Sequence, residues 1–306
     1  MKNKVAIIGA GMVGSTTAYS LITQNTAEEI VLLDANSALA QSQAMDLQHS
    51  VPFAGFTKVQ AGTYQDLKDC AIVVIACGAK QKPGETRLDL VKKNSAIMKD
   101  VVPKVFQANA HAVLIMVSNP VDILTHQAIS LFPKKRDQIL GSGTILDSAR
   151  FRFLLGQHLK INPQSIHAYI VGEHGDSELP LWSTATVGNI PIARFRSLTS
   201  GVKRTIFEKA KNAAYAIIEG KQATYYAIAS GVAELIETIL FDRRTVWPVS
   251  HLMDGEFGLH DVALSLPVVL GRQGIVERLP VGINATEKKQ LKQSAAKLRK
   301  VIQALR

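Results

Sequence analysis

A histidine in a short polar turn is the residue of this sequence best suited to proton transfer. His174 lies in the segment G-E-H-G-D, residues 172–176, which follows an apolar run at 166–171 that is expected to form a strand. An imidazole titrates near neutral pH, so it can both give and take a proton there. A lone histidine after a strand can equally be a hydrogen-bonded surface residue, and this segment alone leaves both interpretations open.

Two further residues suit the same chemistry. A carboxylate beside one ring nitrogen would fix the tautomer of His174 and stabilise its protonated form, and Asp147 is the candidate. Arg150 follows Asp147 by three residues, so on a helix both side chains share one face. The pattern predicts a pocket in which an acid/base group lies beside a guanidinium that can bind a substrate carboxylate.

A glycine-rich turn near the beginning of the chain predicts a dinucleotide site. The motif G-A-G-M-V-G, residues 9–14, follows an apolar strand at 5–8 and opens a helical stretch to about residue 24. The first glycine permits a tight turn, the second lets a pyrophosphate approach, and the third allows close helix packing. The helix start also presents free N–H groups to phosphates. The expected cofactor contacts are Gly9, Gly11, Met12, Val13 and Gly14.

Asp34 indicates which dinucleotide is bound. It ends a second apolar strand, residues 30–33, and lies 20 residues beyond Gly14, the usual offset of the acid that binds the ribose. A carboxylate accepts hydrogen bonds from a ribose diol and repels a 2′-phosphate. No arginine follows it directly. We therefore expect NAD rather than NADP.

The alternation of apolar strands and helices predicts an α/β fold. Further strands are expected at 58–61, 71–76, 112–117 and 138–141, with helices between them. Such a pattern is typical of a doubly wound, Rossmann-type parallel sheet covered on both faces. We expect an NAD-binding domain over 1–141 and an α+β substrate-binding, catalytic domain over 142–306. In the latter, helices are predicted at 203–220, 222–241 and 286–306, and strands or short turns of a mixed sheet at 246–250, 261–270 and 274–279.

Composition narrows the class of protein. A length of 306 residues suits about two domains, and 47% apolar with 20% charged residues is typical of a globular protein. The net charge of +10 favours anionic partners, but no nucleic-acid reader motif accompanies it. Cys70 and Cys77 form no C-x-x-C pair, which suits a reducing compartment. No apolar run is long enough to span a membrane. None of the eight histidines cluster with the spacing of metal ligands. We expect a cytoplasmic protein that binds neither membrane, nucleic acid nor metal.

Six motifs in order carry a resemblance over nearly the whole chain. They are G-A-G-M-V-G, P-G-E-T-R, S-N-P-V-D, L-D-S-A-R, G-E-H-G-D-S-E and A-T-Y-Y-A-I, and together they resemble the lactate/malate dehydrogenase family. The resemblance implies that His174 is the acid/base, oriented by Asp147. It also implies that Arg150 holds the substrate carboxylate bidentately. Arg87, on a mobile loop, would polarise the reacting carbonyl as the loop closes.

The resemblance assigns three more contacts. Asn119 would bind near the substrate oxygen and the cofactor, Thr224 would line the substrate pocket, and Ile228 would offer an apolar face to the nicotinamide. As an alternative, the loops that carry such residues could be plain solvated turns. A non-catalytic NAD sensor of the same fold would normally have lost the reactive histidine or its arginines, and all are present here.

The resemblance further implies an effector site in a homotetramer. Arg152 lies two residues beyond Arg150, so on a helix it points away from the substrate face. His167 lies seven residues before His174, near the start of the same predicted strand. In bacterial members of the family, this arginine and this histidine bind fructose 1,6-bisphosphate where two subunits meet. Both could instead be ordinary surface or interface residues.

Gln81 is the residue expected to select the substrate. In the family this position carries arginine when the substrate has a second carboxylate, as oxaloacetate does. A neutral glutamine would leave that charge unpaired in a closed site, whereas the methyl group of pyruvate is tolerated. The resemblance therefore favours pyruvate and L-lactate, although Lys80 and Lys82 could soften the discrimination.

Replacing this glutamine should change the preferred acid. We predict that Gln81→Arg shifts the ratio of kcat/KM values from pyruvate towards oxaloacetate, because the guanidinium can pair with the second carboxylate. Both acids are assayed by NADH oxidation in wild type and variant. A wild-type preference for oxaloacetate would contradict the assignment.

Overall fold

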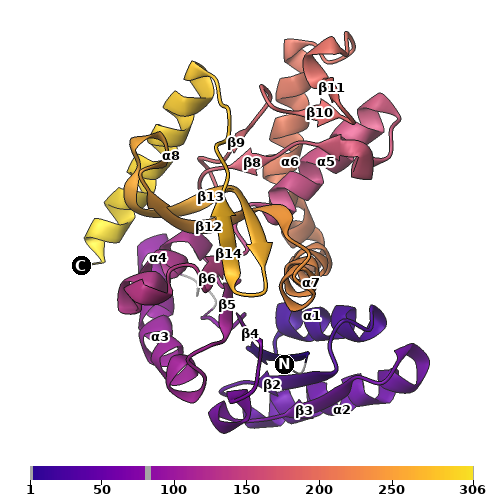
Figure 1. The fold of residues 1–306 in the computed structure, drawn as a ribbon, viewed down its shortest axis with the longest axis vertical. Helices are drawn as coiled ribbons and strands as arrows, with labels where there is room; N and C mark the ends of the chain where they lie inside the picture. Colours follow the sequence, from indigo (N-terminus) through magenta and orange to yellow (C-terminus); the bar gives the residue numbers. More distant parts are fainter. Residues whose placement is uncertain (1–2, 80–83, 306) are drawn as a thin grey trace.

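One nine-stranded sheet runs through the centre of the molecule in the order β14-β13-β12-β6-β5-β4-β1-β2-β3 (Figure 1). The computed structural model describes residues 3–79 and 84–305. Strands β1 to β6 are parallel, and the strand order reverses between β1 and β4, as in doubly wound folds. The expected Rossmann-type sheet is thereby confirmed. Its parallel strands are β1 (Lys4–Ile8), β2 (Glu29–Leu33), β3 (Lys58–Ala61), β4 (Ile72–Ile75), β5 (Val113–Met116) and β6 (Ile139–Gly141).

Helices cover both faces of this sheet because successive strand residues point to opposite sides. Val5 and Ile7 of β1 pack into one apolar cluster with residues of α1 and α2, whereas Ala6 and Ile8 join another with residues of α3 and α4. Between β3 and β4 a single 3-10 turn, Tyr64–Leu67, takes the place of the expected helix. The covering helices are α1 (Met12–Thr23), α2 (Ser37–Ala54), α3 (Arg87–Ala108) and α4 (Val121–Leu131).

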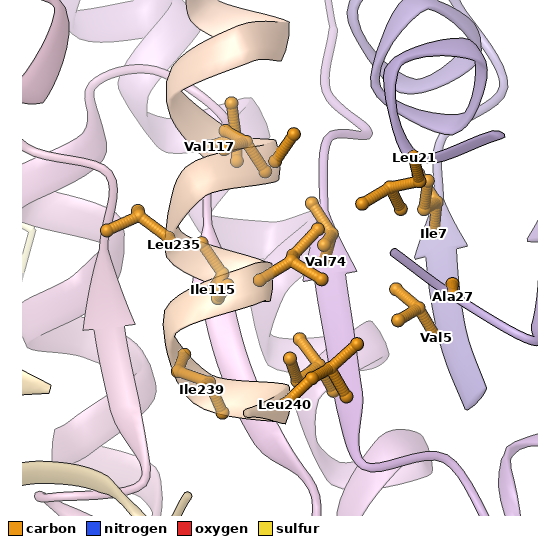
Figure 2. Packing of buried hydrophobic residues seen from close by; sticks show 14 of the residues in the cluster. Val5, Ile7, Leu21, Ala27, Val74, Ile115, Val117, Leu235, Ile239 and Leu240 are labelled. Atoms are coloured by element: carbon orange, nitrogen blue, oxygen red, sulfur yellow. The ribbon is translucent and has the colours of Figure 1, made fainter. Parts of the chain in front are cut away.

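A helix from the second half of the chain completes the first face. In Figure 2, Leu235, Ile239 and Leu240 of α7 (Tyr226–Leu240) pack over strands β4 and β5, beside the region covered by α1. The predicted start of this helix at residue 222 is wrong. Gln222 has a left-handed φ of 68° and ends the preceding helix, α6 (Ser200–Lys221).

The last three strands extend the same sheet. Strand β12 pairs antiparallel with β6 through Ser250 and Gly141, and β13 and β14 continue the antiparallel order. Helix α8, yellow in Figure 1, flanks β13. The sheet is therefore continuous across the boundary expected at residue 141. The bounds are β12 (Thr245–Asp254), β13 (His260–Gly271), β14 (Gly274–Arg278) and α8 (Ala285–Ala304).

The apolar run at 166–171 is two strands instead of the one that was predicted. Strand β7 (Ile166–His167) pairs with β10 (Thr186–Val187), whereas β8 (Ile170–Val171) pairs with β9 (Leu179–Pro180) in a separate sheet. Both follow α5 (Ile145–Leu159). The remaining short elements are β11 (Ile190–Pro191) and the 3-10 turns Pro133–Lys135, Pro163–Ser165, Ile192–Arg194 and Glu256–Gly258. Within residues 3–79 and 84–305, every helix is too short or too polar to cross a bilayer.

Candidate active site

The predicted cofactor residues gather where β1 and β2 end. Gly9 follows β1 with a φ of +110°, and a Cβ there would lie 2.5 Å from the backbone nitrogen of Cys77 after β4. A Cβ on Gly14 would lie 1.9 Å from the carbonyl oxygen of Gly9, so this glycine allows α1 to pack against the turn. A Cβ on Gly11 would meet nothing within 4 Å. The open side of the turn therefore lies at Gly11, at the start of α1.

Asp34 is fixed beside that turn. One carboxylate oxygen accepts the Ala10 N–H at 2.8 Å, and the other accepts the Asn36 N–H at 2.9 Å. A cradle with one open glycine, a free helix start and an adjacent carboxylate fits the pyrophosphate and ribose of NAD. Of the other expected contacts, Met12 is exposed in the first turn of α1, next to Val13. Ile228 is partly buried near the start of α7.

The predicted contact between His174 and Asp147 is present. His174 Nδ1 lies 2.6 Å from Asp147 Oδ2, although the two residues are 27 positions apart. The Asp147 side chain is 3% exposed and that of His174 is 27% exposed. Asp147 occupies the first turn of α5, where the helix dipole favours a negative charge. Because Nδ1 is committed to the carboxylate, Nε2 is the ring nitrogen left for proton exchange with a ligand.

The surroundings favour the protonated imidazole. Burial by itself lowers the pKa of His174, but the negative charge of Asp147 and its hydrogen bond, followed by the charges of Asp122 and Glu178, outweigh it and raise the pKa above 6.5. Burial pushes the pKa of Asp147 upward, yet His174 and Arg150 hold it below its usual value. Both shifts favour a carboxylate at Asp147 and an imidazolium at His174, a combination that can donate a proton.

Arg150 completes the cluster. Its Nη1 donates to Asp147 Oδ1 at 3.0 Å, and its side chain is 13% exposed. The guanidinium is therefore held from one end, in the orientation that the spacing of three residues on α5 imposes. A planar cation beside an acid/base pair can bind a carboxylate through two parallel hydrogen bonds.

The turn that carries His174 is secured from three directions. Gly172 exchanges two backbone hydrogen bonds of 2.9 Å with Ser265 of β13, and the Glu173 N–H donates to Ser294 Oγ of α8 at 2.8 Å. The His174 N–H donates to Asp122 Oδ2 at 2.7 Å. Asp122 belongs to the S-N-P-V-D motif, but the motif alone gave it no function. Its partner lies 52 residues away, so only the tertiary fold shows this role.

Glu178 was also missed by sequence reasoning. Its side chain is buried, and burial together with the charge of Asp147 raises its pKa to about 8. Potential ligand atoms of Asp147, His174 and Glu178 all lie within 4.8 Å of one another, a spacing that a metal ion could also use. The expectation that the protein binds no metal therefore stays a prediction.

The loop residues assigned to the substrate have different standings. Asn119 is exposed after β5, its side chain accepts the Val121 N–H at 3.3 Å, and its carbonyl accepts from Asn94 at 2.7 Å. Asn94 also accepts the Ala79 N–H, so it joins the two loops that follow β4 and β5. Thr224 is half-buried between α6 and α7. Arg87 was predicted on a loop but is the first residue of α3, because the Thr86 side chain caps the helix there, and Gln81 lies outside the described residues.

The two residues expected to bind the effector lie on neighbouring elements. Arg152 is partly buried on α5 and its Nε has no hydrogen-bond partner among the described residues. Its charge acts on Tyr169, two residues beyond the exposed His167. Arg152 does not join the Asp147 cluster, as its position on the helix predicted.

A dinucleotide cradle at the carboxyl ends of β1 and β2, together with a buried histidine–carboxylate pair and a guanidinium that can bind a carboxylate, is the combination expected of a nicotinamide-dependent dehydrogenase. Comparison with known sequences gives the family. Residues 3–141 match the NAD binding domain of lactate/malate dehydrogenase, and residues 144–305 match its alpha/beta C-terminal domain. The chain belongs to the lactate/malate dehydrogenase family.

Several relatives match from end to end. The L-lactate dehydrogenase of Thermus aquaticus is 47% identical, and that of Thermoanaerobacter pseudethanolicus is 46% identical; each alignment covers 99% of both chains. Among solved structures, the minor L-lactate dehydrogenase of Enterococcus mundtii in a ligands-bound form superposes with a TM-score of 0.96 at 37% identity. That superposition covers 100% of this chain and 99% of the other.

Two glycine variants should separate cofactor binding from packing. Gly11→Ala should leave the melting temperature unchanged but weaken NADH binding about tenfold, because its Cβ enters only the open side of the turn. Gly14→Ala should lower stability by about 2 kcal/mol, since its Cβ collides with the Gly9 carbonyl. Fluorescence titration and thermal melts measure both; equal effects of the two variants on melting would contradict the assignment.

Proposed function

We propose that this protein is an L-lactate dehydrogenase that reversibly reduces pyruvate to L-lactate with NADH, the last step of anaerobic glycolysis. The observation that carries this proposal is the buried contact of 2.6 Å between His174 and Asp147, beside Arg150. The full-length similarity to L-lactate dehydrogenases supports the choice of reaction. The neutral Gln81 supports pyruvate over oxaloacetate.

The residues divide the work of ketone reduction among them. When bound, the nicotinamide supplies the hydride. Arg150 binds the carboxylate of pyruvate and fixes its orientation, which brings the ketone oxygen to His174 Nε2. His174 donates its proton to that oxygen, and Asp147 keeps the ring in the tautomer that this transfer requires. In the oxidation of lactate the same nitrogen takes the proton back.

Three residues outside the cluster serve the same transfer. Arg87 polarises the ketone when the loop before α3 closes, Asn119 donates to the substrate oxygen, and Thr224 lines the pocket wall. Because closure excludes water, the positive charge of Arg87 and the dipole of the Asn119 amide act more strongly on the developing oxyanion. The position of Asn94, which holds the loops at Ala79 and Asn119 together, supports this arrangement.

The cofactor side and the substrate side correspond to 1–141 and 142–306. Gly9, Gly11, Met12, Val13 and Gly14 hold the pyrophosphate, and Asp34 binds the adenosine ribose and excludes a 2′-phosphate. Two free cysteines, Cys70 and Cys77, suit a cytoplasmic protein in a reducing environment.

The protein is proposed to work as a homotetramer activated by fructose 1,6-bisphosphate. Phe53 and Phe56, at the end of α2 and just beyond it, are 93% and 96% exposed, which favours burial against another copy. Arg152 and His167, each present twice across a twofold axis, would offer positive charge to two phosphates. The lack of a partner for Arg152 Nε among the described residues supports an anionic ligand there.

The first test removes the acid/base group. His174→Asn should bind NADH as wild type does but reduce pyruvate about a thousandfold more slowly, because the proton donor is lost. His158→Asn, an exposed histidine on α5, is the matched control and should keep full turnover. Stopped-flow NADH oxidation and fluorescence titration provide the two measurements. Substantial turnover by His174→Asn would refute the assignment.

The second test concerns the effector. Fructose 1,6-bisphosphate should lower the apparent KM for pyruvate in wild type, and more so at mildly acidic pH, where an imidazole is charged. Arg152→Ala/His167→Ala should lose the response, whereas Arg194→Ala, an exposed arginine elsewhere, should keep it. If pyruvate saturation in wild type is the same with and without the effector at every pH, activation is excluded.

A further inference from the structure

Asp122 is a buried carboxylate outside the catalytic cluster that nevertheless contacts the catalytic histidine. It occupies the first turn of α4, is 3% exposed, and accepts the main-chain N–H of His174 at 2.7 Å through Oδ2. The same short segment carries Asn119, which is proposed to bind the substrate. One side chain thus joins the segment after β5 to the turn that presents the imidazole.

Few polar groups surround the negative charge of Asp122, which is unusual for a residue with a purely structural role. Its Oδ1 is shielded from solvent and makes no hydrogen bond of standard geometry among the described residues, although the hydroxyl of Ser250 on β12 is close enough to lower the pKa of this carboxyl. Burial raises the pKa of Asp122 to about 6, against the opposing effects of Ser250 and His174. An amide of the same shape would serve the N–H of His174 without the cost of a buried charge. A role in holding the turn therefore does not account for the negative charge.

The charge acts on the proton of the imidazole. The carboxylates that raise the pKa of His174 are Asp147 from α5, Asp122 from α4 and Glu178 beyond the turn, and the guanidinium of Arg150 lies against the other oxygen of Asp147. Those that bear on Asp122 are His174, which stabilises its charge, and Glu173, which opposes it. Asp147 contacts the ring directly, whereas Asp122 contacts the backbone and acts through space.

We propose that Asp122 is a positioning residue for the reduction: it fixes the main chain of His174 relative to the Asn119 segment, and its negative charge helps keep the imidazole protonated. The proposal rests on the proposed function, in which His174 donates the proton. Asp122 therefore makes two contributions. Its hydrogen bond to the His174 N–H can be replaced by an amide, whereas its negative charge cannot.

Asp122→Asn removes only the charge. Its side-chain oxygen still accepts the His174 N–H, so pyruvate reduction at pH 6 should stay close to wild type. The pKa of His174 should fall by about one unit, because one opposite charge nearby is lost. Reduction needs the protonated ring, so kcat/KM falls as pH rises through the pKa of His174. The midpoint of this fall should lie about one pH unit lower in the variant than in wild type. Its melting temperature at neutral pH should not fall, because a buried charge has been removed.

Two further variants define the comparison. Asp122→Ala removes the hydrogen bond as well, and kcat should fall about tenfold at all pH values, the effect of losing one buried contact to a charged group. Asp261→Asn makes the same change beside a different histidine, His126, whose Nε2 lies 3.0 Å from Asp261 Oδ1. Asn tolerates the φ of 50° found at this position, and this control should leave the titration of His174 unchanged.

The deciding measurement is an NMR titration of the histidine ring signals in the ligand-free protein, with His174→Asn used to assign the resonance. It requires no turnover, so a failure of wild type to reduce pyruvate would refute the proposed reaction and leave this result standing. A lower pKa of His174 in Asp122→Asn, with no change in Asp261→Asn, supports the proposal. The same pKa in wild type and Asp122→Asn, or an equal shift in both variants, overturns it.

Discussion

The hydrogen bond between Asp147 and His174 is the contact on which the rest of the site depends. It places a carboxylate at the start of α5 against a ring that enters from a turn after β8, and it fixes which nitrogen faces the ligand. The other oxygen of Asp147 holds Arg150, so one buried acid orients both the imidazole and the guanidinium. A neutral residue at 147 would leave the imidazole without its stabilising charge and the guanidinium without its anchor.

The parts of the molecule that local chemistry determines could be predicted from the sequence. A glycine turn between a strand and a helix has few possible geometries, and Gly9 and Gly14 make the tight turn and the close helix packing that their spacing indicated, whereas the pyrophosphate contact of Gly11 stays a prediction. The parallel sheet likewise follows from apolar runs of strand length. The pairing of His174 with Asp147 was predicted because few other residue types can orient an imidazole, and the structure confirms it.

The features that could not be predicted from the sequence depend on contacts between residues that are far apart in the chain. The run at 166–171 is uniformly apolar, and only the partners β10 and β9 divide it into two strands. The start of α7 depends on the left-handed residue Gln222, which no periodicity marks. The contact of Asp122 with a main-chain N–H involves no side chain of its partner, so residue types carry no signal for it. The roles of Gln81 and Arg87 stay predictions from their motifs.

Strand β12 pairs with β6, and α7 packs over β4 and β5, so residues after 141 complete the sheet that carries the cofactor turn. Residues 1–141 cannot bury their apolar core without residues from the second half of the chain. Cutting the chain after residue 141 would leave β6 as an open edge strand and uncover Ile115 and Val117, which α7 shields. Residues 1–141 therefore cannot be exchanged between proteins without helix α7, which covers them.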